Sequence, residues 1–373
     1  MPVPIRRWLY RFFIAFTILI SILYILVCLV PFLDAGSFWY IAVLGLGFPM
    51  LLIAMLILMI VWMIKKIKVG IVLFVVILLG WQQVSVMLGL NISQKEFVVE
   101  KTEQTLRVLS WNVSRMDEHN KEAKGGVSYR SLILDAISEQ NADVVVLQEF
   151  LEPRPGQPFD MNIEALESMG YAHHYFYPTS SIWEGAVKFG MIIFSRYPIV
   201  DSAHFTFGQT PHSEGLMYAD IKTPTEVVRV FSTHLESSRG SNYGYFGEPG
   251  QGSVVDRSKT VVRGLKRGYS FRNAQAEVVK MQVSASPHPV VLCGDLGDVP
   301  NSKAYFTTRG KLNDVFLEKG VGLGATFRFI SPTLRLDYIF AQPKLKVTQY
   351  NRPDLPYSDH YLLVADLDLI SGE

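Results

Sequence analysis

The sequence predicts an α/β domain of mixed or sandwich architecture that follows a hydrophobic N-terminal segment. Three observations support this fold class. The first quarter of the 373 residues contains three long runs without a charged residue. Beyond it, short runs rich in Val, Ile and Leu recur, with amphipathic helical stretches between some of them. The later runs lie too close together for a helix after each one, which argues against a barrel of eight βα units.

Composition narrows the function classes. The hydrophobic fraction is 49%, and the excess over an ordinary soluble enzyme lies in the first quarter of the chain. The net charge is +1, which fits neither a protein that coats nucleic acid nor one with an acidic tail. The only two cysteines are Cys28, in an apolar run, and Cys293, in a predicted strand. They argue against a disulfide framework or a cysteine-based zinc site.

The three uncharged runs are each long enough to cross a bilayer as a helix. They hold 22 residues between Arg11 and Asp34, 30 between Asp34 and Lys65, and 26 between Lys68 and Lys95. A crossing needs about 20. The first run exceeds the apolar core of a signal peptide, about 7–15 residues, and no small-residue cleavage site follows it. We therefore predict three transmembrane helices within an anchor that spans residues 1–93.

Charge in the short loops predicts the orientation. The N-terminus carries Arg6, Arg7 and Arg11, the loop after the second run carries Lys65, Lys66 and Lys68, and the first loop carries only Asp34. The positive-inside rule places the N-terminus in the cytoplasm and, after three crossings, the remaining chain outside it. The third run is diluted by Gln82, Gln83 and Ser85. If it does not cross, the domain faces the cytoplasm instead.

Residues 94–105 are polar and charged and are predicted as a linker, and residues 106–373 as the α/β domain. Its predicted strands are 106–113, 143–150, 188–195, 227–235, 289–295 and 334–341. Helices are predicted over 129–140 and 270–283. A basic stretch, 257–272, is either a solvated helix face or a surface that faces phosphate.

Polar side chains recur where the predicted strands end. They are Asn112, Glu149, His234, Asp295 and Asp337, together with Asp359 and His360 in the segment "YSDH". Each has an ordinary explanation by itself: Glu149 could cap a strand, and His234 could be a hydrogen-bonded core histidine. Buried ionisable groups are costly unless they are paired, hydrogen-bonded or bound to a metal. The whole set therefore favours a functional site.

The residue types in this set suit the hydrolysis of a phosphate ester. Oxygen ligands such as Asn112, Glu149 and Asp359, without cysteine, favour Mg²⁺ or Mn²⁺ over zinc. Such a cation neutralises phosphate charge, and a carboxylate beside a histidine can activate water. The sequence contains neither G-x-x-x-x-G-K-[ST] nor G-x-S-x-G, so it does not support NTP hydrolysis by a P-loop and argues against acyl transfer.

Seven segments, in order, resemble one enzyme group. "LRVLSWNV", "DVVVLQE", "GMIIFSRYPI", "STHLES", "GDLGDVPNS", "LRLDYIF" and "YSDH" are similar to motifs of the endonuclease/exonuclease/phosphatase superfamily, the DNase I-like fold, which the chain matches over about 105–370. That superfamily includes nucleases, abasic-site endonucleases, neutral sphingomyelinases and inositol-phosphate 5-phosphatases. The resemblance implies a four-layered α/β sandwich of two mixed β-sheets flanked by helices, with divalent-metal phosphoesterase activity. It also implies a membrane-anchored member of bacterial type, located in the inner membrane.

The resemblance also implies roles for individual residues. Glu149 would be the principal metal ligand, assisted by Asn112 and Asp359. Asp295 would orient or deprotonate the attacking water, while His234 and His360, the latter held by Asp337, would contact the scissile phosphate. Arg196 in "FSRYP" is a weaker candidate for phosphate contact. No protein partner is implied.

One position departs from the family pattern. Where the family has Asn two residues after the aspartate, this chain has Gly297. Loss of one such donor costs on the order of 10²–10³ in rate. Three hypotheses therefore remain: a phosphodiesterase or phosphomonoesterase that acts on nucleic acid or another phosphoester, a phosphatase or phosphodiesterase for membrane lipid phosphates, and a catalytically weakened pseudoenzyme or binding domain.

Overall fold

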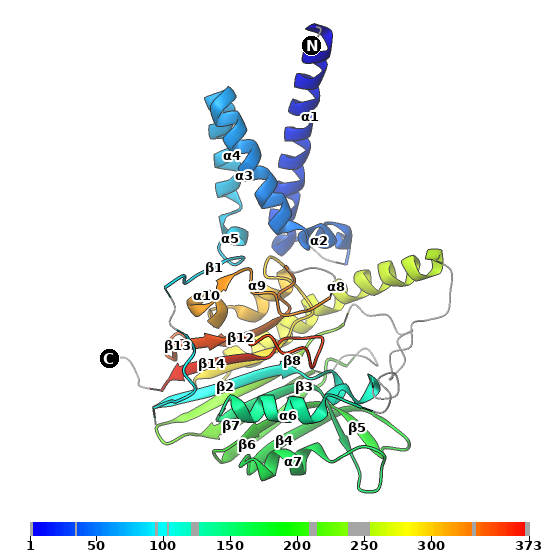
Figure 1. Ribbon diagram of the computed structural model, residues 1–373, viewed down its shortest axis with the longest axis vertical. Coiled ribbons are helices and arrows are strands. Elements are labelled where there is room, and N and C mark those ends of the chain that lie inside the picture. The colour runs from blue at the N-terminus through cyan, green and yellow to red at the C-terminus, as the bar shows by residue number, and fades with distance from the viewer. Residues whose placement is uncertain are drawn as a thin grey trace.

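The computed structural model describes residues 3–33, 36–93, 96–102, 104–120, 127–208, 215–237, 254–329 and 333–369. Two six-stranded mixed sheets form the domain (Figure 1). The first sheet has the order β13 (Lys346–Asn351), β14 (Leu363–Asp368), β2 (Thr105–Asn112), β3 (Val144–Pro153), β5 (Val187–Ser195), β4 (His173–Ile182). The second has the order β10 (Asn313–Asp314), β12 (Asp337–Ala341), β9 (Val290–Asp295), β8 (Val227–His234), β7 (Gly215–Lys222), β6 (Ile199–Phe205). All six predicted strands are confirmed, with ends shifted by up to three residues.

The central strands are buried on both faces, which explains their nearly continuous apolar sequence. In β3, Val144 and Val146 face the core between the two sheets, whereas Val145 and Leu147 face the core on the outer side. Helices cover the outer faces: α6 (Arg130–Glu139) and α7 (Asn162–Ser168) cover the first sheet, and α8 (Val254–Ser284) and α9 (Lys303–Arg309) cover the second. The predicted four-layered sandwich is therefore confirmed.

Only two pairs of neighbouring strands in these sheets are parallel, and these pairs position the polar strand ends. β2 pairs with β3 and β8 with β9 in parallel, so that Asn112 lies beside Gln148 and His234 beside Asp295. β12 is antiparallel to β9 and begins at Asp337, directly opposite Asp295. The carboxyl ends of the two parallel pairs and the start of β12 therefore meet.

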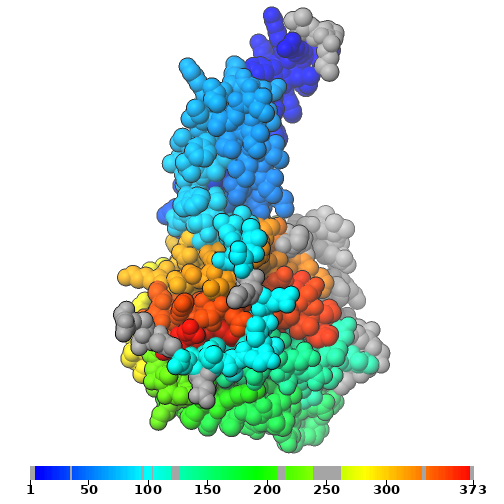
Figure 2. Space-filling model, turned by 60° about the vertical axis from the view of Figure 1, so that its left-hand side comes forward, coloured from blue at the N-terminus to red at the C-terminus, as the bar shows by residue number. Residues whose placement is uncertain are grey.

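The N-terminal segment forms helices that project from the domain (Figures 1 and 2). They are α1 (Val3–Cys28), η1 (Val30–Phe32), α2 (Trp39–Gly45), α3 (Phe48–Lys65), α4 (Ile67–Leu79) and α5 (Trp81–Val84). Two spans, Ile5–Phe32 and Phe48–Lys65, are long and apolar enough to cross a membrane. The third run is interrupted at Gly80, between α4 and α5, and α4 has only 13 residues. Two candidate spans are thus present, and the third crossing stays a prediction.

The chain that joins these helices to the domain packs against it. Val86 lies in the core beneath α8, and its carbonyl oxygen accepts a 2.7 Å hydrogen bond from Arg335 Nη2. β1 (Gly89–Leu90) pairs with β11 (Val321–Gly322). Within the predicted linker, the backbone N–H of Val98 donates to Gln349 Oε1 at 2.9 Å. The domain boundaries given above therefore stay a prediction, since residues on both sides of 94 contact the domain.

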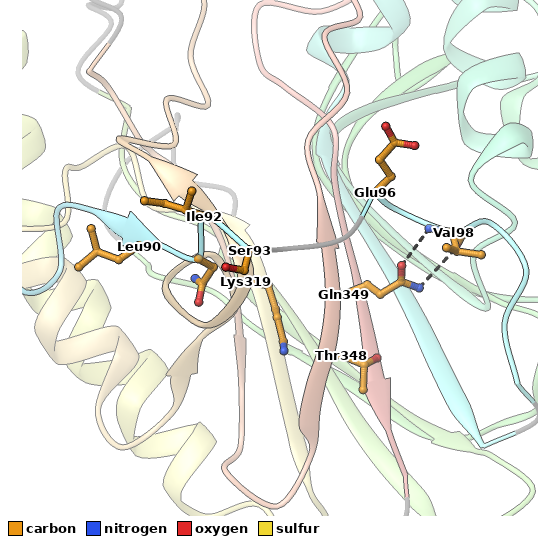
Figure 3. Close-up of a pocket in the computed structure, with 9 residues that line it drawn as sticks. Leu90, Ile92, Ser93, Glu96, Val98, Lys319, Thr348 and Gln349 are labelled. Carbon is orange, nitrogen blue, oxygen red and sulfur yellow. Dashed lines mark hydrogen bonds between the residues drawn. The ribbon is translucent and has the colours of Figure 1, made fainter.

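A hollow lies where this connection crosses β13 (Figure 3). Its lining consists of Leu90, Asn91, Ile92, Ser93, Glu96, Val98, Lys319, Thr348 and Gln349. None of the polar residues at the strand ends lines this hollow. It is therefore separate from the site described next.

Candidate active site

Asp295, at the carboxyl end of β9, lies at the centre of the polar cluster. Its Oδ2 is 3.6 Å from His360 Nε2 and 3.7 Å from His234 Nε2. The same oxygen accepts a hydrogen bond from Asn112 Nδ2 at 3.2 Å, and Oδ1 accepts one from the backbone N–H of Gly297 at 2.7 Å. Burial by itself raises the pKa of Asp295, but the nearby histidines outweigh burial and lower that pKa below its ordinary value. Asp295 is therefore an ionised carboxylate.

Asp337 and His360 form a buried hydrogen-bonded pair. His360 Nδ1 lies 2.8 Å and 3.0 Å from the two carboxylate oxygens of Asp337, which leaves Nε2 directed at Asp295. Burial opposes a charged imidazole, but the carboxylates of Asp337 and Asp295 raise the pKa of His360 well above its ordinary value. His360 is thus a protonated donor at neutral pH. The indole N–H of Trp111 donates to the carbonyl oxygen of His360 at 3.0 Å, which fixes the backbone at His360.

Glu149 projects from a bulge in β3. The register between β3 and β5 shifts between Leu147 and Phe150, and Glu149 has a φ of +50°. This left-handed conformation is uncommon for a residue other than glycine, and bulges re-aim side chains next to active sites. Glu149 is half-buried, whereas the neighbouring residues of β3 are fully buried. Two polar residues, Gln148 and Glu149, interrupt the apolar run at this point, but the same pattern would fit the end of a strand, so the bulge could not be predicted.

Asn112 connects Glu149 to Asp295. Its amide NH₂ donates to Glu149 Oε1 and to Asp295 Oδ2, each at 3.2 Å. Its Oδ1 accepts the backbone N–H of Ser114 at 3.0 Å. The donors and acceptors around the amide therefore fix its orientation, with nitrogen towards the carboxylates. In this arrangement Asn112 holds two carboxylates together, and its predicted role as a metal ligand stays a prediction.

Asp359 lies between two fixed neighbours. The hydroxyl of Ser358 donates to the carbonyl oxygen of Asn112 at 2.7 Å and accepts the backbone N–H of His360 at 3.2 Å. The carbonyl oxygen of Asp359 accepts the N–H of Arg328 at 3.0 Å. The half-buried side chain is thereby held on the same edge as Asn112 and His360.

Gly297, the departure from the family pattern, adopts a left-handed conformation with a φ of +58°. An added Cβ would lie 3.5 Å from the carbonyl oxygen of Glu236 and 3.6 Å from Arg272 Nη1, which are ordinary contacts. The position therefore has room for a Cβ, although its φ strains any residue other than glycine. Asparagine is among the residue types that tolerate this region of φ and ψ best.

Arg272, in the predicted basic stretch, belongs to the support of this site. It is 1% exposed, its Nε donates to Asp298 Oδ2 at 3.2 Å, and its Nη1 donates to the carbonyl oxygen of Glu236 at 3.0 Å. Arg272 is neither a solvated residue nor a surface group. Its charge and helical position do not distinguish it from Arg263, which is exposed. No sequence signal could have found its role.

Arg196 is the one predicted residue that the structure does not bring to the site. β5 is antiparallel to β3, and Ser195 pairs with Val144 at the start of β3. Glu149 is five residues further along β3, which corresponds to roughly 15 Å. The guanidinium of Arg196 lies over the ring of Tyr171, 5.2 Å from its centroid. Arg196 would lie near Glu149 only if β5 ran parallel to β3, and the motif "FSRYP" does not encode strand direction.

The donor groups divide into two sets. Ligand atoms of Asp295, Asp337 and His360 lie within 4.8 Å of one another. Both oxygens of Asp337 approach His360 Nδ1, so this trio suits proton transfer and hydrogen bonding. The half-buried carboxylates of Glu149 and Asp359 supply hard oxygen donors, and the sulfur of Cys293 is buried in the core between the sheets. These residues fit Mg²⁺ or Mn²⁺.

Comparison with known proteins agrees with this fold. The structure is similar to an endonuclease/exonuclease/phosphatase from Beutenbergia cavernae DSM 12333, with 24% identity, a TM-score of 0.51, and coverage of 71% of this chain and 72% of that one. The corresponding protein from Bacteroides vulgatus has 19% identity and a TM-score of 0.50, with coverage of 72% and 100%. No curated protein matches the chain.

Family models divide the chain as its composition does. Residues 10–87 match a domain of unknown function. Residues 109–360 match the model of the Endonuclease/Exonuclease/phosphatase family, whose members are generally hydrolases of phosphoesters. That match begins in β2, ends at His360, and covers more than half of the chain. The chain therefore belongs to the Endonuclease/Exonuclease/phosphatase family.

Proposed function

We propose that this protein is a membrane-anchored, divalent-metal-dependent phosphoesterase that hydrolyses a phosphodiester or phosphomonoester. One observation carries the proposal: Asn112 and Asp295, from different sheets, are joined directly to Glu149, His234 and the Asp337–His360 pair. A cluster of buried carboxylates and histidines at one edge is costly unless it binds or reacts. The family to which the chain belongs acts on the same class of bond.

In this proposal Glu149 and Asp359 hold Mg²⁺ or Mn²⁺, with Asn112 as an assisting ligand. When bound, the cation neutralises phosphate charge and stabilises the leaving oxygen. The strained backbone at Glu149 supports this assignment, because strain of this kind is found at functional sites.

The chain's own residues supply the proton chemistry. Ionised Asp295 orients a water molecule for attack and accepts a proton from that water. His360, protonated and held by Asp337, donates a hydrogen bond to a phosphate oxygen, and His234 donates to another. These donors stabilise charge that grows in the transition state.

The anchor and its orientation are part of the same proposal. α1 and α3 expose large apolar side chains, among them Phe12, Ile18, Ile53 and Ile57, as helices in lipid do. α4 and α5 lead the chain back from Lys65 to the domain (Figure 1). We therefore retain three crossings, with the N-terminus cytoplasmic, the anchor over 1–93, the linker over 94–105, and the domain over 106–373 extracytoplasmic.

A second candidate function is hydrolysis of a membrane lipid phosphate. Leu46, from the anchor, packs against a cluster that contains Phe327, and the ring centroid of Phe327 is 5.0 Å from that of His360. The proposed site is therefore one layer of side chains from the anchor. This arrangement supports a substrate that lies in the same membrane as the anchor.

The test is hydrolysis by the full-length chain in detergent with Mg²⁺ or Mn²⁺. The substrates are plasmid DNA, bis(p-nitrophenyl) phosphate, p-nitrophenyl phosphate and a phosphorylated lipid in vesicles. We expect Glu149→Ala and chelation by EDTA each to reduce turnover by on the order of 10²-fold or more. The matched control is Glu139→Ala, which changes an exposed glutamate of α6.

The outcome separates the hypotheses. Turnover of DNA supports a nuclease, and turnover of the lipid alone supports the second candidate. Activity that persists in Glu149→Ala and in EDTA would contradict the metal-dependent mechanism. If no substrate is hydrolysed in a metal-dependent way, the hypothesis of a pseudoenzyme or binding domain remains.

A further inference from the structure

The first loop of the anchor packs directly on the loops that carry the proposed catalytic residues. We define the anchor turn as residues 42–47, the end of α2 and the two residues that precede α3. Three contacts join it to the domain: a carbonyl oxygen at Ala42, another at Gly45, and the side chain of Leu46. A tether that only held the domain near a membrane would need none of these contacts.

The first connection leads to the Asp337–His360 pair. Leu46 packs against the apolar cluster of Val299, Phe327 and Leu334. The backbone N–H of Phe327 donates to the carbonyl oxygen of Leu334 at 3.2 Å, and Phe327 also forms a bridge with His360. Next to Phe327, the hydroxyl of Thr326 accepts the backbone N–H groups of Leu336 and Asp337 at 2.8 Å and 2.9 Å. Leu46 thus supports the segment that holds both members of the pair.

The second connection leads to the loop after Asp295. The side-chain amide of Asn301, which is fully buried, donates to the carbonyl oxygen of Gly45 at 3.3 Å. An added Cβ on Gly45 would come within 3.2 Å of that amide nitrogen, so the backbones approach closely. Asn301 follows Asp295 by six residues in the same loop. The anchor therefore restrains that loop at its far end.

A third connection passes through α8. The hydroxyl of Tyr269 donates to the carbonyl oxygen of Ala42 at 3.3 Å. The guanidinium of Arg272 lies 4.6 Å from the centroid of the Tyr269 ring and donates to Asp298 at 3.2 Å. Tyr269 is 3% exposed and lies in the same apolar cluster as the anchor residues Ile41 and Ala42.

We propose that the anchor turn is a positioning element of the catalytic site, with Leu46 and Asn301 as positioning residues for Asp295, Asp337 and His360. The expected effect on turnover rests on the proposed function. The docking of the anchor turn on the domain rests on the contacts alone. Catalytic groups must be held within a fraction of an ångström of their productive positions. Full activity then requires the anchor to be folded and docked, which couples the enzyme to correct membrane insertion.

The test uses the full-length chain in detergent and compares Leu46→Ala with Leu44→Ala. Leu44 is two residues away and 40% exposed, and thus serves as the matched control. With bis(p-nitrophenyl) phosphate, we expect Leu46→Ala to lower kcat by about 10- to 100-fold with KM unchanged, since misplacement affects the transition state most. Leu46→Met should restore most of kcat. Asn301→Ala, which removes a single hydrogen bond, should lower kcat in the same direction.

Amide hydrogen exchange of the same variants provides a readout that does not depend on activity. In Leu46→Ala we expect exchange over 296–302 and 326–329 to accelerate on the order of tenfold relative to Leu44→Ala, because these loops lose a packing partner. Equal exchange and equal kcat in the two variants would overturn the inference. A change in KM alone would also overturn it. Faster exchange in Leu46→Ala without hydrolysis by the wild type would support the docking and refute the proposed function.

Discussion

Two groups of buried carboxylates in this protein differ in the residues that neutralise them. In the framework, Asp314 and Asp366 are each matched to an arginine. Asp366 pairs with Arg107 through two hydrogen bonds of 2.6 Å and 2.8 Å. Asp314 accepts Arg335 Nη1 at 2.5 Å, with both side chains 1% exposed. Both ion pairs have short, direct contacts and are enclosed by the protein.

In the candidate site the partners are different. Asp295 and Asp337 lie opposite one another in neighbouring strands, and both contact His360. The other partners of Asp295 are His234, an asparagine amide and one backbone N–H. A histidine can gain or lose its charge, whereas an arginine cannot. The framework thus fixes its charges, and the site retains groups that can exchange protons.

The largest expected effect comes from Asp295→Asn. Because Asp295 is the proposed proton acceptor, we expect turnover to fall by about 10²–10⁴-fold. Stability should fall modestly, because the lowered pKa of Asp295 means that its negative charge is favourable in the folded protein, beside His360 and His234. Steady-state kinetics and thermal unfolding of the full chain measure both effects. A large loss of stability would show that Asp295 belongs with the framework carboxylates.

Asp298→Asn is the matched framework variant, three residues along the same loop. Asp298 is 1% exposed and pairs with Arg272. The variant leaves a buried guanidinium without its counter-charge, which costs about 3–5 kcal/mol in the free energy of unfolding. Denaturant unfolding should show this loss, and the double variant Arg272→Met with Asp298→Leu should recover most of it. If Asp298→Asn lowered turnover without affecting stability, the division between framework and site would be wrong.

The smallest expected effect is a gain. Gly297→Asn places an amide donor in an open position with a φ that asparagine tolerates. We expect turnover to increase by up to about 100-fold, the lower end of the effect of one transition-state donor. Gly297→Ala adds the Cβ without the amide and should give no gain. Equal turnover of Gly297→Asn and wild type would show that this glycine does not limit the rate.

Much of the fold could be predicted from local pattern. The strands recognised in advance are the central ones, such as β3 and β9, because burial on both faces produces continuous apolar runs. Edge strands such as β4, with "HHYFYPTSSI", were not recognised, because their half-exposed faces carry polar residues. The third crossing was predicted from length alone, which does not register the break at Gly80.

The site could be predicted in part for a related reason. Asn112, His234 and Asp295 stand at the carboxyl ends of parallel strands, and such ends meet at one edge. Arg196 also follows a strand, but an antiparallel one, and its end lies elsewhere. Arg272 lies within a helix and reaches the site by packing, which no strand-end rule describes.

The sequence by itself determined which segments are apolar and which chemical groups are available. These properties depend on the residue types of neighbouring positions and on the spacing of apolar residues along the chain. Only the tertiary structure decided the direction in which each strand pairs, the bulge that turns Glu149, the buried role of Arg272, and the contact between Leu46 and the loops of the candidate site. Those features arise between residues up to hundreds of positions apart, where packing rather than local preference sets the geometry.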